Sequence, residues 1–297
     1  MQPLLQDTLI LALILGFALM EWLSRRYRDT VHATANDTRL ELAMFVSLIA
    51  ISQPLALLGS HAICAWLMPA QRDAWAHWPW WAMLGALLVA DDLTQYLWHR
   101  ASHTPLLWAL HRAHHSSQYM SIRVTYRNNF FYYLMMPGLW LSGALVYLGL
   151  GPVYTVYIVV KIAVILGAHS AWRWDEPLYR VKALRPLMWL LERTLSTPAT
   201  HWAHHALTNA DGVGHYKGNF GNLLFVWDML FGTAHITRQY PPAIGLMDDR
   251  LYGPEHWVDQ MFYPLRRSTR EHTALRPGGR AYEDPADLRH AATKGQA

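Results

Sequence analysis

Long apolar stretches constrain the fold of this chain more than any other feature of its sequence. A helix crosses the hydrocarbon core of a bilayer with about 20 mostly apolar residues. Five stretches reach or approach that length: residues 4–22, 41–67, 78–97, 130–149 and 152–168. Charged residues make up only 15% of the sequence, against about 25% in soluble domains. We therefore expect an all-α fold, an integral membrane helical bundle of four to five spans.

The connections between these stretches predict how the chain crosses the bilayer. The fourth stretch meets the fifth at Leu150, Gly151 and Pro152, so the two should form a tight hairpin. The second stretch is either one long helix or a span with a re-entrant turn near Pro54. Lys161 lies inside the fifth stretch, and we expect it to snorkel or to face the protein interior.

Basic residues near the ends of the stretches predict their orientation. They gather between the first and second stretches, between the third and fourth, and after the fifth, whereas the opposite loops carry only Arg72. Since Lys and Arg mark cytoplasmic loops, we expect the amino terminus outside and a long carboxy-terminal part in the cytoplasm. The first stretch lacks the flanks of a cleaved signal peptide and should remain as a helix. The final residues, KGQA, are no retention signal, which favours a bacterial inner membrane over the endoplasmic reticulum.

Eight of the 17 histidines fall into three short clusters. The first is His-x-x-x-His at the cytoplasmic end of the third stretch, and the other two are both His-x-x-His-His. Their members are His99, His103, His111, His114, His115, His201, His204 and His205. Residues i, i+3 and i+4 share one face of a helix, so each cluster is expected to aim its imidazoles at one point.

This spacing is typical of metal ligands. Because the hairpin returns the chain to its starting side, all three clusters can converge on the cytoplasmic side. Eight imidazoles exceed what one ion can use, so two metal ions are implied. Neutral nitrogen ligands suit iron, copper or zinc, and spacing alone does not choose among them.

Other chemistries lack their usual sequence signals. A zinc protease would need His-Glu-x-x-His, but Arg100, Ala101 and Ser102 follow His99. The sequence holds no G-x-S-x-G, P-loop or G-x-G-x-x-G motif. A net charge of +4 without a run of Lys and Arg fits an anionic membrane leaflet, and we expect no nucleic-acid partner.

Together, the three clusters, their order and the interposed hairpin resemble the fatty acid hydroxylase and sterol desaturase superfamily. Residues 219–233, NFGNLLFVWDMLFGT, are similar to the family's stretch N-Y-G-x-x-x-x-x-W-D-x-x-F-G-T, with Phe220 in place of Tyr. The resemblance covers about residues 85–235. It implies a membrane anchor of four or five helices under a cytoplasmic histidine-rich helical cap.

The expected organisation follows from the limits of this resemblance. Residues 1–84 would form the amino-terminal membrane anchor, and residues 85–235 the di-iron catalytic domain. A cytoplasmic extension would occupy residues 236–265. Residues 266–297 are polar, and we expect them to form a disordered tail.

The resemblance also implies a chemistry. Such enzymes hold two irons and use O2 with two electrons from an external donor to hydroxylate or desaturate a lipid. Carried over by position, the eight clustered histidines are catalytic metal ligands. His169, which stands where many relatives have a histidine, and His215, near the last cluster, are further candidates. No fused haem-binding segment is visible, so a separate cytochrome b5-like protein or a ferredoxin and its reductase would supply the electrons.

Asp91 and Asp92 lie one to two helical turns before His99 in a largely apolar stretch. Buried carboxylates in a membrane are costly and usually functional. We expect them to accept hydrogen bonds from ligand histidines and so fix their tautomers, the alternative being a pair at the membrane interface. Asn219 or Asn222 could supply a weaker oxygen ligand or a turn.

Four functions remain open from the sequence. Lipid hydroxylation is favoured, lipid desaturation at the same site comes second, and another lipid oxygenation such as ether cleavage third. A metal transporter or a bis-histidine haem protein comes last. In that class the ligands should face each other within the spans, whereas these clusters lie at and beyond the cytoplasmic ends.

Overall fold

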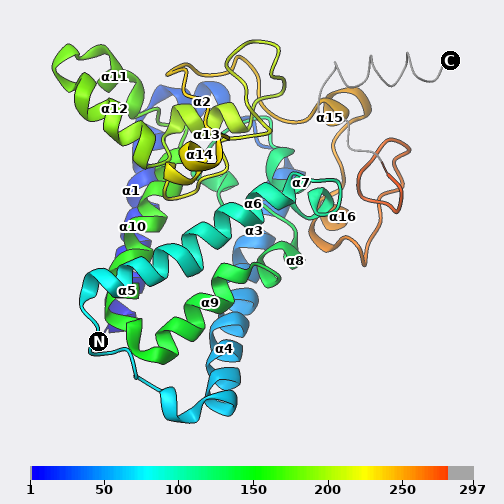
Figure 1. Cartoon of the computed structure of the whole chain (residues 1–297). Coiled ribbons are helices and arrows are strands. Elements are labelled where there is room, and N and C mark those ends of the chain that lie inside the picture. The colour runs from blue at the N-terminus through cyan, green and yellow to red at the C-terminus, as the bar shows by residue number, and fades with distance from the viewer. Residues whose placement is uncertain (1, 280–297) are drawn as a thin grey trace.

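The fold is all-helical in the part of the chain that the computed structural model describes, residues 2–279 (Figure 1). Within those residues, extended pairing is limited to two isolated bridges, Leu195 with Leu224 and Ala206 with Ile244. The expected all-α class is therefore confirmed for the described chain.

Three helical segments are long and apolar enough to cross a membrane: Leu4–Leu23, Ala35–Leu67 and Phe130–His169. The first lies within α1 (Gln2–Leu23). The second joins α3 (Ala35–Ser47), the π-helical turn η1 (Leu48–Ser52) and α4 (Gln53–Leu67). Of the two alternatives for this stretch, the long helix is correct. Pro54 lies directly after the π-helical turn η1, at the start of α4.

The third segment is the expected hairpin. It runs through α8 (Phe130–Leu134), α9 (Pro137–Leu145) and η5 (Val146–Leu150) into α10 (Gly151–His169). The chain reverses at Gly149, whose φ of 110° and whose approach to Ala76 exclude a side chain. As Figure 1 shows, the two arms splay apart: α9 packs along α4, and α10 packs along α1.

The expected span at residues 78–97 is not among these apolar segments. It is helical, as α5 (Trp80–Leu87), η3 (Leu88–Leu93) and α6 (Thr94–Ser102). However, Asp91 and Asp92 make its middle polar, and both carboxylates are buried inside the bundle. The three apolar segments contain four of the five expected stretches, because the third segment holds both arms of the hairpin.

Short helices and loops form a cap over one end of the apolar helices (Figure 1). Its main elements are α7 (Trp108–His115), α11 (Asp175–Arg180), α12 (Arg185–Thr194), α13 (Pro198–His204) and α14 (Val226–Phe231). On the carboxy-terminal side, α15 (Met247–Tyr252) and α16 (Trp257–Phe262) follow.

Ion pairs fasten the carboxy-terminal part to the cap. The fully buried Arg112 of α7 donates to Asp248 at 2.9 Å and contacts Asp249, while Arg270 reaches Asp248 at 2.7 Å and Glu255 at 3.1 Å. We call these five residues the Arg112 cluster. Part of the expected tail, residues 266–279, is thus tied into the fold. Residues 280–297 lie outside the described chain.

Candidate metal centre

Four helices bring nine histidines to one place in the cap. His99 lies in the last turn of α6, with His103 at its end, and three histidines lie on α7. His169 ends α10, and the last cluster occupies α13 and its carboxyl cap. Thr197 and Pro198 start α13, because the Thr197 side chain accepts the Thr200 N–H and Pro198 needs no partner for its nitrogen.

The nine rings form two groups, and within each group the ligand atoms all lie within 4.8 Å of one another. The first histidine group is His99, His103, His111, His115 and His204. The second histidine group is His114, His169, His201 and His205. The groups adjoin, since the rings of His115 and His205 stack with centroids 4.4 Å apart.

Each His-x-x-His-His cluster is divided between the two groups, which corrects the expectation that a cluster aims at one point. His111 and His115, four residues apart, join the first group, whereas His114 joins the second. On α13, His201 and His205 join the second group, whereas His204 joins the first. Positions i+3 and i+4 differ by about 100° around a helix of 3.6 residues per turn, which is enough for neighbouring rings to face different ions.

Carbonyl oxygens fix the ring orientations. In the first group, Nδ1 of His99 and Nδ1 of His204 each lie 2.7 Å from a carbonyl oxygen, those of Phe220 and Gly218. In the second group, Nδ1 of His114 lies 3.1 Å from the Arg127 carbonyl, and Nδ1 of His169 lies 2.8 Å from that of Ile165. A carbonyl only accepts, so Nδ1 must carry the proton and Nε2 of each neutral ring presents a lone pair.

These lone pairs face each other. Nε2 of His99 lies 3.0 Å from Nε2 of His204, and Nε2 of His114 lies 3.3 Å from Nε2 of His169. Two lone pairs at such a distance repel unless a cation sits beside both. Nitrogens bound to one ion at about 2.1 Å, with octahedral to tetrahedral angles, lie about 3.0 to 3.4 Å apart. Both groups therefore fit a metal ion.

Burial keeps the rings neutral. It lowers the pKa of His99 to about 4, and it lowers the pKa values of His115 and His205 well below the usual 6.5, with neighbouring imidazoles adding to the effect. Several ring nitrogens have no hydrogen-bond partner among the described residues, including both of His103 and Nε2 of His111 and of His115. Buried polar atoms are rarely left unpaired, so these nitrogens are suited to an ion.

A small cavity of about 70 Å³ adjoins both groups. We call it the inner cavity. It is lined by His99 and His111 of the first group, by His114 and His169 of the second, and by Gln95 and Asn222 among others. The space beside the candidate ions is therefore in contact with ligands of both.

The model of the fatty acid hydroxylase family matches residues 83–233, just over half of the chain. The chain belongs to the fatty acid hydroxylase family. The resemblance seen in the histidine clusters is thus confirmed. The family segment contains every histidine of the two groups and the polar loop that orients them.

Curated relatives agree with the family. Alkylglycerol monooxygenase of Danio rerio is 30% identical over 63% of this chain and 37% of its own length. The alkylglycerol monooxygenase of Homo sapiens is 29% identical over 52% of this chain and 30% of its own length. Ornithine lipid hydroxylase OlsE of Rhizobium tropici is 27% identical over 65% of this chain and 54% of its own length. The chain thus spans a third to a half of these relatives. No solved structure matches it.

The loop before the family's Trp-Asp pair carries residues whose role the sequence did not reveal. Asp228 accepts the N–H groups of Phe220 at 2.8 Å and Gly221 at 2.7 Å, and the Thr233 hydroxyl at 2.6 Å. It thereby shapes the loop whose carbonyls hold His99 and His204. Local spacing gave no signal for these partners, because they are backbone atoms that reach the rings only through the fold.

His215 is not brought into either group. Its ring lies beside that of His235, with centroids 5.1 Å apart, and its backbone N–H donates to the Ala203 carbonyl at 2.7 Å. His169, in contrast, is placed in the second group. Of the two asparagines, Asn219 donates to the carbonyls of Thr200 and His235 in a turn, and Asn222 lines the inner cavity.

The expected bonds from Asp91 and Asp92 to histidines are also absent among the described residues. Asp91 pairs with Lys161 at 2.6 Å and accepts from the Tyr157 hydroxyl at 2.8 Å. Asp92 accepts from Nε1 of Trp227 at 2.8 Å and from the Leu224 N–H at 3.2 Å. The prediction was wrong because carbonyl oxygens and Asn128 occupy the Nδ1 side of the ligand rings. The two carboxylates instead hold helices and the Trp-Asp segment together, and Lys161 faces the interior.

Proposed function

We propose that this protein is a membrane-bound, non-haem di-iron oxidoreductase that hydroxylates a lipid with O2 and electrons from a separate donor. The single observation that carries the proposal is the pairing of facing Nε2 lone pairs in each of two adjoining histidine groups. Family membership supports iron as the metal, and supports His99, His103, His111, His114, His115, His169, His201, His204 and His205 as its ligands.

Each part of the chain has a definite task in this proposal. Two bound irons would supply the activation of O2 that an unactivated C–H bond requires. The first and second histidine groups would each hold one of them, and the carbonyls of Phe220, Gly218, Arg127 and Ile165 would keep the rings aimed. The inner cavity would receive the reacting carbon and exclude water. Overall, a C–H bond becomes C–OH, O2 takes up two electrons and two protons, and water leaves.

The relatives favour hydroxylation over desaturation, because the names monooxygenase and hydroxylase both describe enzymes that insert oxygen into the substrate. These names also suggest a lipid substrate, either an ether lipid or an acylated one. The basic residues at the cap end of the apolar helices support a cytoplasmic site, with a cytochrome b5-like or ferredoxin-type donor reaching it from that side.

Metal and product analysis of the full chain tests the proposal. Protein purified from iron-replete cells should contain about two irons per chain. Lipid extracts of cells that make the protein should contain a species with one additional oxygen that is absent from cells without it. Stoichiometric zinc with no turnover under reducing, aerobic conditions would contradict the proposal. Products that lose two hydrogens without gaining oxygen would show desaturation. Reporter fusions at residues 75 and 120 should report outside and cytoplasm, respectively.

A further inference from the structure

Three cavities meet at one side chain, Tyr126. A groove of about 440 Å³ runs between α1 and α3, and we call it the side groove. A slot of about 350 Å³ lies among α1, the α3–η1 helix, α9 and α10, and we call it the central slot. Tyr126 lines the side groove, the central slot and the inner cavity beside the histidines. The three therefore adjoin in the order groove, slot, metal centre.

Most side chains shared by these cavities are apolar or aromatic, and Gln95, shared by the central slot and the inner cavity, is polar. Ile14 of α1 and Phe45 of α3 line both the side groove and the central slot. The rings of Phe45 and Tyr126 lie 5.7 Å apart between centroids. Tyr133 and Met136 line both the central slot and the inner cavity. Since α1 and α3 belong to segments apolar enough to cross a membrane, the surroundings of the side groove are suited to hydrocarbon.

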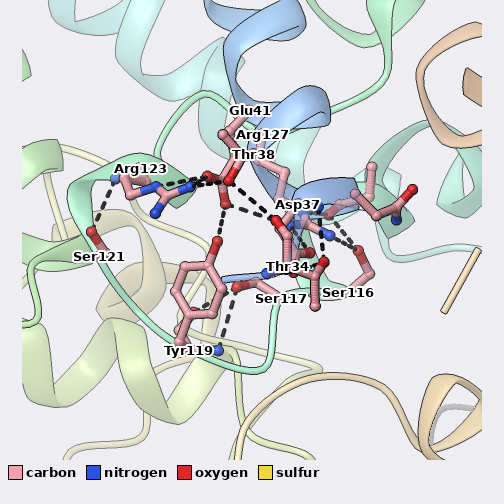
Figure 2. A network of polar contacts seen from close by, with 12 residues as sticks. Thr34, Asp37, Thr38, Glu41, Ser116, Ser117, Tyr119, Ser121, Arg123 and Arg127 are labelled. Carbon is pink, nitrogen blue, oxygen red and sulfur yellow. Dashed lines mark hydrogen bonds and ion pairs between the residues drawn. The ribbon is translucent and has the colours of Figure 1, made fainter. Parts of the chain in front are cut away.

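One cation stands at the lip of the side groove. Arg123 lines it with a side chain that is 29% exposed. Nε of Arg123 donates to Glu41 at 2.9 Å, and Nη2 donates to Thr38 at 2.8 Å (Figure 2). Nη2 of Arg123 also lies 2.8 Å from Glu41, which lines the groove too, and Tyr27 is a further hydrogen-bond partner. A guanidinium has five N–H groups, one more than these four contacts use, and a remaining N–H of a cation can donate to an oxygen of a phosphate or carboxylate.

The residues around Arg123 hold its side chain in place, and they also contact one another without it. Figure 2 shows Glu41 at the centre, in contact with the Tyr119 hydroxyl, Arg123 and Arg127. Arg127 also pairs with Asp37 at 2.6 Å. Glu41 would therefore keep a cation and a hydroxyl if Arg123 were neutral. Moreover, the Tyr27 side chain of α2 (Arg25–Thr30) forms a hydrogen bond with Arg123 and so helps to hold it at the lip.

We propose that the side groove is the lateral entrance for a membrane lipid with an anionic head group. Arg123 binds the oxyanion of the head group at the lip. The Phe45 and Tyr126 rings direct one hydrocarbon chain through the central slot to the inner cavity. The destination of that chain rests on the function proposed above, whereas the binding site itself does not require turnover.

Photo-cross-linking of a defined lipid tests this entrance. The full chain is placed in nanodiscs that contain phosphatidylglycerol with a diazirine on one acyl chain, and labelled peptides are identified by mass spectrometry. Labels should concentrate in residues 38–45 and 122–136. Arg123→Gln should reduce this labelling about tenfold, the worth of one charge-assisted hydrogen bond. Diacylglycerol with the same acyl chain lacks the phosphate. It should label the groove of the unchanged protein as weakly as phosphatidylglycerol labels the groove of Arg123→Gln.

Matched variants separate the entrance from general effects. Arg180→Gln removes an arginine that is 77% exposed and paired only with Glu176 among the described residues, and it should leave labelling unchanged. Tyr126→Trp should preserve labels near residue 42 and reduce those near residue 136, because a larger ring narrows the shared wall. Equal labelling of Arg123→Gln and the unchanged protein, at equal melting temperature, would overturn the proposal, as would labels spread over the outer face of α4.

The outcomes for the entrance and for the chemistry are distinguishable. Labelling requires neither iron nor O2, so a labelled groove in an inactive, iron-free protein would support the entrance while the proposed function failed. An active iron enzyme whose groove stays unlabelled would overturn the entrance and leave the function intact.

Discussion

Two buried polar regions of this molecule differ in how their groups face one another. In the histidine groups, neutral rings turn lone pairs toward each other, as Nε2 of His99 and Nε2 of His204 do at 3.0 Å. In the Arg112 cluster, opposite charges meet, and Arg112 contacts Asp248 and Asp249 directly. Nitrogen lone pairs that face each other repel unless a cation lies between them, whereas opposite charges already attract each other. The first region is therefore built for a ligand and the second for the fold.

Removing one ring from each histidine group is the strongest test of this difference. His204→Ala and His201→Ala each delete a ligand, so turnover should fall more than about a hundredfold, beyond the 10- to 100-fold loss usual for residues that merely orient ligands. Iron content should fall with it, as measured by elemental analysis. Membrane insertion should be unchanged. Either variant with full activity and two irons would remove that group from the metal centre.

Neutralising the Arg112 cluster should act on stability instead. Arg112→Met leaves Asp248 and Asp249 buried with Arg270 as their remaining cation, and should destabilise the protein by about 3 to 5 kcal/mol. Chemical unfolding in detergent measures this. The exposed counterpart Arg180→Met should change stability by about 0 to 1 kcal/mol. Equal effects of the two substitutions would mean that the cluster contributes little to the fold.

Acid should destabilise the metal-free protein through the buried neutral histidines of the histidine groups. Burial lowers the pKa of His99 from 6.5 to about 4 in the folded state, so the unfolded chain binds more protons between these values. The stability that neutral histidines allow is complete above about pH 6.5 and declines as the pH falls toward 4. Thermal melting in the presence of a chelator should show this decline. The double variant His99→Ala, His204→Ala should show a shallower one, and an unchanged slope would assign the acid sensitivity to the carboxylates.

The smallest expected effect is that of replacing His215, which the fold does not place in either histidine group. His215→Ala should change turnover and iron content less than about twofold, because the His215 ring lies against His235 rather than a ligand. His169→Ala is the matched comparison and should behave like His204→Ala. A large loss of iron in His215→Ala would show that this residue moves into the centre when metal binds.

The helical class, the apolar hairpin, the three histidine clusters and the family could all be predicted from the amino-acid sequence. These features are local: apolar length predicts membrane helices, and spacings of three and four residues place side chains near one another on a helix. They also predicted that two ions are involved, because eight imidazoles exceed the needs of one.

The assignment of each imidazole ring to one of the two histidine groups depends on the fold and could not be predicted from the sequence. His114 and His115 are neighbours in the chain, yet they join different groups because His169 and His103 approach them from separate helices. The hydrogen-bond partners of the rings also depend on the fold. Asp91 was expected to hold a ligand histidine, but it pairs with Lys161 across the bundle, and a backbone carbonyl holds His99 instead. A carbonyl is present at every residue, so no sequence pattern marks the few that the fold turns toward an imidazole.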